Sequence, residues 1–361
     1  MPPESVLNAA DVSVILPAFN ARATIARALT SIAAQTVKPR EVIVVDDGST
    51  DGTFEAAGAA AQGLEGIELK VIRQDNRGAG AARNRAVREA VSSVLAFLDA
   101  DDEWLPAHLE ASLAHMHDGD YVLTAHDGIQ VAPDGGESFI NCTSRFNQGP
   151  DPLVTLYRKG YIDTCTVLAR RDAVIKAGGF DETLPNAQDF ELWLAILKAP
   201  DARFLVFADA LSRYHITPGG IMSNTERRLD CCLRIASDYA RALKDRPGSP
   251  LMHLCYRVLA VHFEAMMSYK ERNKFTAALW TLARAPFSMI AHSIRFLFAI
   301  PKERTDFLQS RVNSATMNDP CPTLPAFAVP ALYLWATVVL GLYLYQFRPL
   351  MGGILRALGL G

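Results

Sequence analysis

The sequence lacks long blocks of one charge sign, and its 36 basic and 39 acidic residues leave a formal net charge of only −3. Proteins that bind nucleic acid usually carry a basic stripe or patch, so this near balance predicts no nucleic-acid partner. The first residues, Met-Pro-Pro-Glu-Ser, also lack the basic segment and apolar core of a secretory signal peptide. We therefore expect no signal of that kind.

Cysteine is scarce, with six residues in 361, and their positions do not show the paired spacing of a zinc site. Cys231 and Cys232 are adjacent, in a segment with helical periodicity. This pattern favours a reduced, cytosolic environment over a disulfide scaffold. With 50% hydrophobic and 21% charged residues, the composition fits a globular protein with some membrane character.

Short apolar runs in the first hundred residues have the pattern of buried strands, and three of them end in polar residues. These three runs and their polar ends are 12–16 with 17–20, 41–45 with 46–47, and 94–98 with 99–102. Helical periodicity at 21–35, 54–62 and 81–90 alternates with these runs and with a further strand at 69–72. The alternation predicts an α/β fold with a doubly wound, mostly parallel sheet. Ligands bind beyond the carboxyl ends of such strands, where the polar residues gather.

Asp99 and Asp101 carry the clearest chemical signal at this edge. At the strand period of two they point to the same side. Two close carboxylates repel each other, and the pKa of one rises unless a cation lies between them. Hard divalent ions such as Mg²⁺ take these oxygen ligands together with substrate phosphates. The pattern predicts a divalent metal site, and a solvated acidic loop is the structural alternative.

Six short motifs then occur in order between about residues 12 and 223. They are Ser13-Val-Ile-Leu-Pro-Ala-Phe-Asn20, Val44-Val-Asp-Asp-Gly-Ser-Thr-Asp51, Gly78 with Ala81-Ala-Arg83-Asn84, Phe97-Leu-Asp-Ala-Asp-Asp102, Gly178-Gly-Phe-Asp-Glu182 and Gln188-Asp-Phe-Glu-Leu-Trp193. On these motifs the chain resembles the family-2 glycosyltransferases with a GT-A fold, of the inverting, non-processive type. The resemblance covers about the first three-fifths of the chain.

The resemblance implies roles at a nucleotide-sugar site for Pro17, Phe19, Asn20, Asp47, Arg83 and Asp99. Phe19 matches the ring that stacks on the nucleotide base, and a core phenylalanine is the alternative. Asp47 matches the carboxylate that hydrogen-bonds the base, and Asp99 matches a ligand on the ribose side. Arg83 lies near the base or phosphates in relatives, whereas an ordinary surface arginine is the alternative.

The resemblance also implies a metal ligand and a catalytic base. Asp101 matches the direct ligand of Mn²⁺ or Mg²⁺, and His215 is a further candidate ligand or a structural histidine. Asp189 matches the base that deprotonates the acceptor hydroxyl, although an aspartate at a helix start is often only a cap. The preceding residue is Gln188, where many relatives have a second acid.

The rest of the chain has a different character. We expect a transferase domain at 1–223, an amphipathic helical subdomain at 224–300 and a membrane-anchoring segment at 301–361. Helical patterns cover 226–243, 251–270 and 275–284, and the apolar segment 286–301 is expected on a bilayer surface or against protein. Residues 326–347 form an apolar run without charge, long enough to span a bilayer. A surface-lying or buried helix remains the alternative for that run.

The sequence thus predicts a membrane-associated enzyme with its catalytic domain on the cytoplasmic side. It would move one sugar from a nucleoside-diphosphate sugar to an acceptor hydroxyl, with a lipid-linked glycan for cell-surface polysaccharide as the expected acceptor. One rival is a non-catalytic membrane scaffold that binds a nucleotide sugar. The other is a nucleotidyltransferase, which typically has a glycine-rich, basic loop where this chain has residues 17–20.

Overall fold

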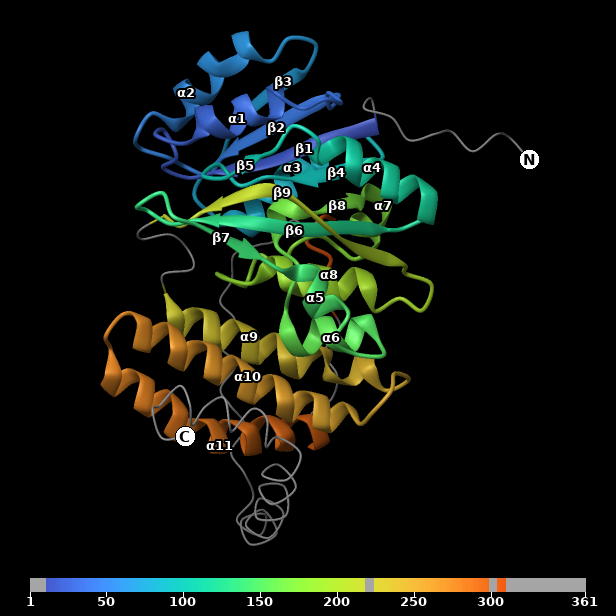
Figure 1. The fold of residues 1–361 in the computed structure, drawn as a ribbon, viewed down its shortest axis with the longest axis vertical. Helices are drawn as coiled ribbons and strands as arrows, with labels where there is room; N and C mark the ends of the chain where they lie inside the picture. The colour runs from blue at the N-terminus through green and yellow to red at the C-terminus, as the bar shows by residue number, and fades with distance from the viewer. Residues whose placement is uncertain (1–10, 218–223, 299–303, 310–361) are drawn as a thin grey trace, which may run out of the picture.

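The computed structural model describes residues 11–217, 224–298 and 304–309. Helices cover a β-sheet in the first two-thirds of the chain, and long helices stack beyond it (Figure 1). The strands are β1 Val12–Ala18, β2 Glu41–Asp46, β3 Glu68–Arg73, β4 Val94–Phe97, β5 Glu103–Trp104, β6 Leu123–Val131, β7 Glu137–Ile140, β8 Leu168–Arg170 and β9 Phe204–His215. Their order is β3-β2-β1-β4-β8-β6-β9-β5, with β7 paired to β6.

The α-helices up to the end of the sheet are α1 Ile25–Ala33, α2 Thr53–Ala59, α3 Ala79–Glu89, α4 His108–Gly119, α5 Cys142–Phe146, α6 Pro152–Lys159, α7 Arg171–Lys176 and α8 Gln188–Leu197. After β9 come α9 Thr225–Tyr239, α10 Pro250–Glu271 and α11 Phe275–Phe298. Single 3₁₀ turns lie at Ala60–Gly63, Thr164–Thr166 and Ala240–Leu243.

The sheet is mixed, so the prediction of a mostly parallel sheet is wrong for its second half. Strands β3, β2, β1 and β4 are parallel neighbours, as the alternation of strands and helices indicated. From β4 onward, β8 pairs antiparallel with both β4 and β6, and β5 and β7 are antiparallel to their partners, whereas β6 and β9 are parallel. β7 is mostly exposed, which is typical of an antiparallel strand rather than of a strand buried on both faces.

Alternate residues of β1 fill two cores on opposite faces of the sheet. Val14 and Leu16 pack in a cluster with residues of α1 and α4. Ile15 packs in a second cluster that includes Ala82 of α3 and Trp193 of α8. Because β1 is buried along its whole length, it has the continuous apolar pattern that identified it as a strand.

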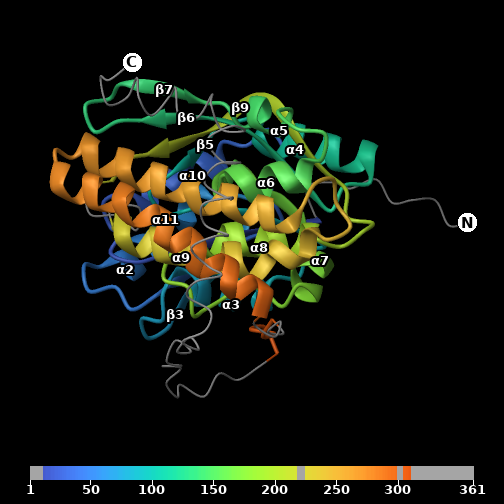
Figure 2. The same ribbon diagram turned by 90° about the horizontal axis from the view of Figure 1, so that it is seen from below.

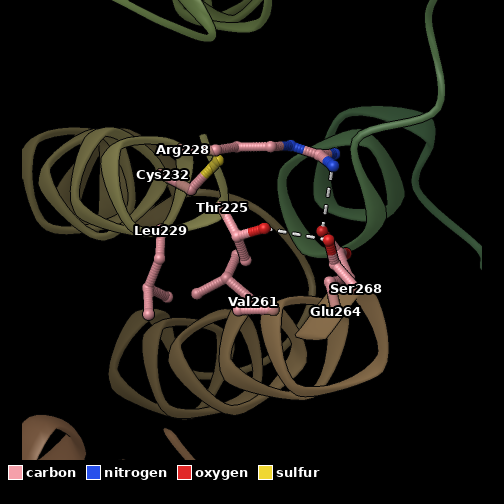
Figure 3. Close-up of a pocket in the computed structure, with 8 residues that line it drawn as sticks. Thr225, Arg228, Leu229, Cys232, Val261, Glu264 and Ser268 are labelled. Atoms are coloured by element: carbon pink, nitrogen blue, oxygen red, sulfur yellow. Dashed lines mark hydrogen bonds and ion pairs between the residues drawn. The ribbon is translucent and has the colours of Figure 1, made fainter. Parts of the chain in front are cut away.

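The C-terminal helices α9, α10 and α11 form a layer in which α11 is outermost (Figures 1 and 2). Between α9 and α10 a cavity of about 20 Å³ is bridged by two polar contacts (Figure 3). Arg228 lies 3.7 Å from the Glu264 carboxylate, and the Thr225 and Ser268 hydroxyls are 2.9 Å apart. These contacts fix the two helices in register.

Helix α11 continues through Pro286, whereas the sequence pattern predicted an end near residue 284. Proline removes one backbone donor and usually kinks or ends a helix. Here Ala285 and Met289 are buried on either side of it, where α11 packs along α10. Tertiary packing of the inner face therefore outweighs the lost hydrogen bond.

Within the part of the chain that the structure describes, no helix is both long enough and apolar enough to cross a membrane. The predicted apolar run 326–347 lies outside the described residues, as does all of the predicted domain 301–361 except 304–309. The domain boundaries proposed from the sequence stay predictions. The five described cysteines are buried and unpaired.

A buried histidine pair lies between α4 and β6. His126 Nδ1 is 2.6 Å from the Asp127 carbonyl oxygen, to which it donates, and its Nε2 is 2.7 Å from His108 Nδ1. Burial lowers the pKa of His126 to about 4, and burial together with His126 lowers the pKa of His108 well below its usual value. His108 Nε2 is buried without a hydrogen-bond partner among the described residues, so a proton there would have no acceptor.

The histidine pair predicts acid destabilisation between about pH 6.5 and pH 4. In this window the unfolded chain binds protons that the folded chain excludes, so the free energy of unfolding falls as pH falls. For His126 alone the full loss is about 3 kcal/mol. Urea unfolding at a series of pH values gives the free energy of unfolding as a function of pH. The slope of that curve between about pH 6.5 and pH 4 should be shallower for His126→Gln than for the wild type. His117→Gln, at an exposed position of α4, should keep the wild-type slope; equal slopes for all three proteins would contradict the prediction.

Candidate active site

The polar strand ends predicted to gather do lie at one edge of the sheet. In the parallel register Ala18 pairs with Asp46, and Ile15 pairs with Phe97. The residues that follow β1, β2 and β4 therefore leave the sheet side by side. They are the segments 17–20, 46–47 and 99–102.

Asn20 ties the end of β1 to the turn after β2. Its backbone is in the left-handed region, with φ of 49°, which asparagine tolerates better than most residues. Its N–H donates to Ser49 Oγ at 2.8 Å, and its side-chain oxygen accepts from the Thr50 N–H at 3.0 Å. Pro17 is buried in β1, whereas the ring of Phe19 is 52% exposed. Phe19 is therefore not a core phenylalanine, and its ring is accessible for stacking.

Asp47 is buried and holds the loop that precedes α3. Its carboxylate accepts from Gln74 Nε2 at 2.7 Å, from the Arg77 N–H at 3.0 Å and from the Gly78 N–H at 2.7 Å. The neighbouring Asp46 accepts from the Ser49 N–H at 3.1 Å and so fixes its own turn. The role of Asp47 toward a nucleotide base stays a prediction.

Arg83 is buried, so the alternative of an ordinary surface arginine is wrong. Its guanidinium forms an ion pair with Asp99 at 2.5 Å and lies 5.4 Å from the centre of the Phe180 ring. Burial alone would lower the pKa of Arg83, but the charges of Asp99 and Asp189 outweigh it and raise the pKa. The arginine therefore pairs with the acid at the end of β4, and the acid on α8 is near enough to act on its charge.

Asp101 and Asp102 have separate partners, although they are adjacent in sequence. Asp101 accepts from the Thr217 hydroxyl at 2.9 Å. Asp102 is fully buried and accepts from Cys165 Sγ at 3.0 Å and from the His215 N–H at 2.8 Å. Burial and the charge of Asp99 raise the pKa of Asp101, and burial with the charges of Asp101 and Asp99 raises that of Asp102 further.

This crowding of carboxylates fits a divalent cation. Ligand atoms of Asp99, Asp102 and Cys165 lie within 4.8 Å of one another, which differs from the predicted pair Asp101 and His215. Burial raises the pKa of the Cys165 thiol, and the nearby charge of Asp102 raises it further, so the thiol stays protonated and is a poor metal ligand. Carboxylate oxygens are the remaining donors, and these are the ligands of Mg²⁺ and Mn²⁺.

The ring of His215 faces an acid that sequence reasoning did not single out. Its Nε2 lies 3.2 Å from Glu103 Oε1, while its backbone N–H binds Asp102. The structure thus places His215 beside the acidic segment through its backbone. Its role as a metal ligand stays a prediction.

Asp189 lies in the first turn of α8, but it is not the helix cap. The capping position is Ala187, with φ of 56° and no capping side chain. Asp189 Oδ2 accepts from the Thr164 hydroxyl at 2.6 Å, a contact that the sequence did not indicate. Trp193 holds the helix in place, since its ring packs edge-on against Phe97 of β4 at 5.5 Å.

Residues 304–309 lie against Gly178 and Gly179, and this close contact leaves no room for side chains at the two positions. Both glycines have positive φ, of 86° and 75°. A Cβ atom on Gly179 would lie 2.5 Å from Asn84 Oδ1 and 2.7 Å from Leu308 Cγ. The Phe307 N–H donates to the Gly178 carbonyl at 2.8 Å. The segment after α11 therefore returns to the part of the chain that contains the sheet.

Arg304 anchors this returning segment on the helix that carries Asp189. Its Nε and Nη2 donate to the two oxygens of Glu191, each at 2.7 Å, and it also donates to the Ala177 and Gly179 carbonyls. Glu191 is buried and accepts a further hydrogen bond from Tyr239. We call the paired hydrogen bonds between Arg304 and Glu191 the Arg304 clamp. The sequence did not predict it, because a contact between residues 113 positions apart leaves no local pattern.

A pocket of about 490 Å³ lies beside this region, between residues 183–185 and the first turns of α9. Its lining is mainly polar and charged and includes Asn224, Arg227, Asp230 and Arg234. Arg234 also pairs with Asp181 at 2.9 Å, directly after the Gly-Gly-Phe turn.

Replacing Arg304 with Met is expected to lower the free energy of unfolding by about 3 kcal/mol, because Glu191 keeps a buried charge without its cation. The matched control is Arg295→Met, whose side chain is 55% exposed and whose loss should change stability by less than about 0.5 kcal/mol. Denaturant unfolding of both variants measures the difference. Similar values for the two variants would show that the clamp contributes little.

The chain is similar to known proteins over the same region. Residues 13–178 match the family model described as glycosyl transferase family 2. The putative teichuronic acid biosynthesis glycosyltransferase TuaG of Bacillus subtilis is 31% identical, over 59% of this chain and 82% of its own length. The UDP-Glc:alpha-D-GlcNAc-diphosphoundecaprenol beta-1,3-glucosyltransferase WfgD of Escherichia coli is 28% identical, over 73% of this chain and 98% of its own length.

Among solved structures, the mannosyltransferase PcManGT from Pyrobaculum calidifontis in complex with GDP-Man and Mn²⁺ superposes with a TM-score of 0.55 at 20% identity. The match covers 80% of this chain and 87% of that one, and at this identity it shows a shared fold. The fold is thus the GT-A type that the sequence motifs indicated. The match to TuaG extends over most of that protein at more than 30% identity, so the chain belongs to glycosyl transferase family 2 and is a glycosyltransferase.

Proposed function

We propose that this enzyme transfers a single hexose from a nucleoside-diphosphate sugar to an acceptor hydroxyl with inversion at the anomeric carbon. The observation that carries the proposal is the position of Arg83, which pairs with Asp99 and lies close enough to Asp189 for that charge to raise its pKa. One buried cation thus pairs with an acid expected at the donor diphosphate and also feels the charge of the acid expected at the acceptor. A binding scaffold would not require that link.

Asp189 is the proposed base. The Thr164 hydroxyl and the Phe190 N–H each donate to one of its oxygens, which orients the carboxylate at the start of α8. A carboxylate held in this way takes the proton of the acceptor hydroxyl as the oxygen attacks the anomeric carbon. The glycosidic bond forms as the bond to the diphosphate breaks, and a single displacement of this kind inverts configuration.

Asp101 and Asp99 are the proposed ligands of a divalent metal, Mn²⁺ or Mg²⁺. When bound, the ion neutralises charge that develops on the departing diphosphate. Arg83 donates to Asp99 and orients it for that purpose, and the Thr217 hydroxyl orients Asp101. The fold shared with PcManGT, whose complex contains GDP-Man and Mn²⁺, supports this assignment.

The proposed acceptor is a lipid-linked glycan used for cell-surface polysaccharide. WfgD carries a diphosphoundecaprenol acceptor in its name and matches this chain over 98% of its own length, which supports the class of acceptor. We place the catalytic domain on the cytoplasmic side of the cell membrane, where nucleotide sugars are made. The apolar run 326–347, outside the described residues, is the proposed membrane span.

Replacing Asp189 with Asn is expected to abolish transfer while donor binding is retained, since the amide cannot accept the acceptor proton. The rate should fall by roughly a thousandfold, within the range for loss of a general base. Product formation is measured with a panel of nucleotide sugars, and donor binding by calorimetry. Asp209→Asn, at an exposed position of β9, is the control; transfer by Asp189→Asn at near the control rate would refute the base assignment.

Replacing Asp101 with Ala is expected to remove the metal-dependent part of donor binding. Calorimetric titration of nucleotide sugar is carried out with Mn²⁺ and again with a chelator present. The wild type and Asp209→Asn should bind more tightly with Mn²⁺, whereas Asp101→Ala should bind equally in both conditions. A metal response of normal size in Asp101→Ala would refute its role as a ligand.

A further inference from the structure

Helix α11 carries most of the large apolar side chains that are exposed in the described part of the chain. Six of the ten such residues lie on it: Phe275, Leu279, Trp280, Phe287, Leu297 and Phe298. Trp280, Phe287 and Phe298 are separated by 7 and 11 residues, close to whole numbers of helical turns, so they lie along one stripe. Contiguous apolar surface of this kind marks an interaction site.

The stripe faces away from the rest of the protein. The buried residues of α11 are small or flexible (Ala278, Thr281, Ala285, Met289 and Ser293), and this inner face packs on α10. Figures 1 and 2 show α11 as the outermost helix of the layer, on the side away from the sheet. Trp280 is 67% exposed and Phe287 is 74% exposed, so neither ring is used by the fold.

The charged residues of α11 itself have one sign. Helix α11 contains no aspartate or glutamate, and its two arginines are Arg284 and Arg295. Arg284 pairs with Glu226 at 2.6 Å, whereas Arg295 is 55% exposed and lies 3.8 Å from Asp238. Arg272 and Lys274 are exposed just before the helix begins. The apolar stripe therefore has basic residues near both of its ends and no acid on its own helix, and the nearest acids are Glu271 before the helix and Glu226 and Asp238 on α9.

We propose that the outer face of α11 lies in the interface of a membrane that contains anionic phospholipid. A helix with aromatic and aliphatic residues on one side and basic residues at its margins binds in the plane of such an interface. Tryptophan favours this position because its ring is apolar and its N–H remains hydrated. Over 24 residues the helix offers about 36 Å of contact along the bilayer surface.

A second copy of the chain fits this face less well. Two α11 helices paired antiparallel about a twofold axis would bring Lys274 of each copy close to Arg295 of the other. Like charges at both ends oppose that arrangement, whereas anionic headgroups are attracted to both. In-plane contact would also hold the catalytic domain beside a lipid-linked acceptor, a consequence that rests on the function proposed above.

The test uses the full chain with Trp335→Phe, reconstituted into vesicles of phosphatidylcholine and phosphatidylglycerol. Trp104 and Trp193 are buried, so Trp280 is then the exposed tryptophan of the described residues. Vesicles with brominated acyl chains should quench Trp280 emission relative to ordinary vesicles. A further Trp280→Phe substitution should remove the quenching, which assigns the signal to that ring.

Phe287→Glu in the same background should abolish most of the quenching, because a carboxylate in the stripe opposes insertion. Phe139→Glu, at a position of β7 that is 58% exposed, is the matched control and should leave the quenching intact. Absence of Trp280 quenching in brominated vesicles overturns the proposal. Trp280 emission that changes with protein concentration but not with added lipid also overturns it, because it would indicate that a second copy of the chain covers the stripe. The measurement needs neither donor nor metal, so its failure is distinct from failure of the transfer reaction.

Discussion

A buried arginine surrounded by carboxylates is the interaction on which the site depends. Arg83 pairs with Asp99 and is influenced by Asp189, while Asp101 and Asp102 lie in the same acidic region. A buried cation is costly unless it is paired, and removing either partner leaves an uncompensated charge. One guanidinium cannot offset all these acids, so the pKa values of Asp101 and Asp102 are raised by burial and by their neighbours. A cation added at this edge would relieve the repulsion that remains.

The helix that carries Asp189 is fixed from three directions. Trp193 packs it against β4, Thr164 binds its first turn, and Arg304 clamps Glu191 from a segment beyond α11. The glycine pair at 178–179 makes the last contact possible, because side chains there would collide with the returning chain. The sheet alone therefore does not hold α8 in place. The chain after α11 also supports the helix that carries the proposed base.

Local patterns predicted much of this fold and of the site. Strands β1, β2 and β4 are continuous apolar runs, and the residues that follow them meet because parallel strands share an edge. The mixed second half of the sheet was not foreseen, since β8 has only three residues and β9 is partly exposed. Thr164, Glu191 and Arg304 were also missed, because each acts through contacts between distant residues. Helix α11 passes Pro286 for the same reason, as packing against α10 overrides a local signal.

The three aspartates after β4, Asp99, Asp101 and Asp102, have different hydrogen-bond partners and therefore different roles. Asp102 is fully buried with both oxygens engaged, one by Cys165 and one by the His215 N–H, so it serves to hold β9 against the acidic segment. Asp99 accepts one side-chain hydrogen bond, from Arg83, and Asp101 accepts one, from the Thr217 hydroxyl. Mg²⁺ sites typically use one or two carboxylates and leave the remaining positions to water and phosphate oxygens. The number of carboxylates left by the fold matches that requirement.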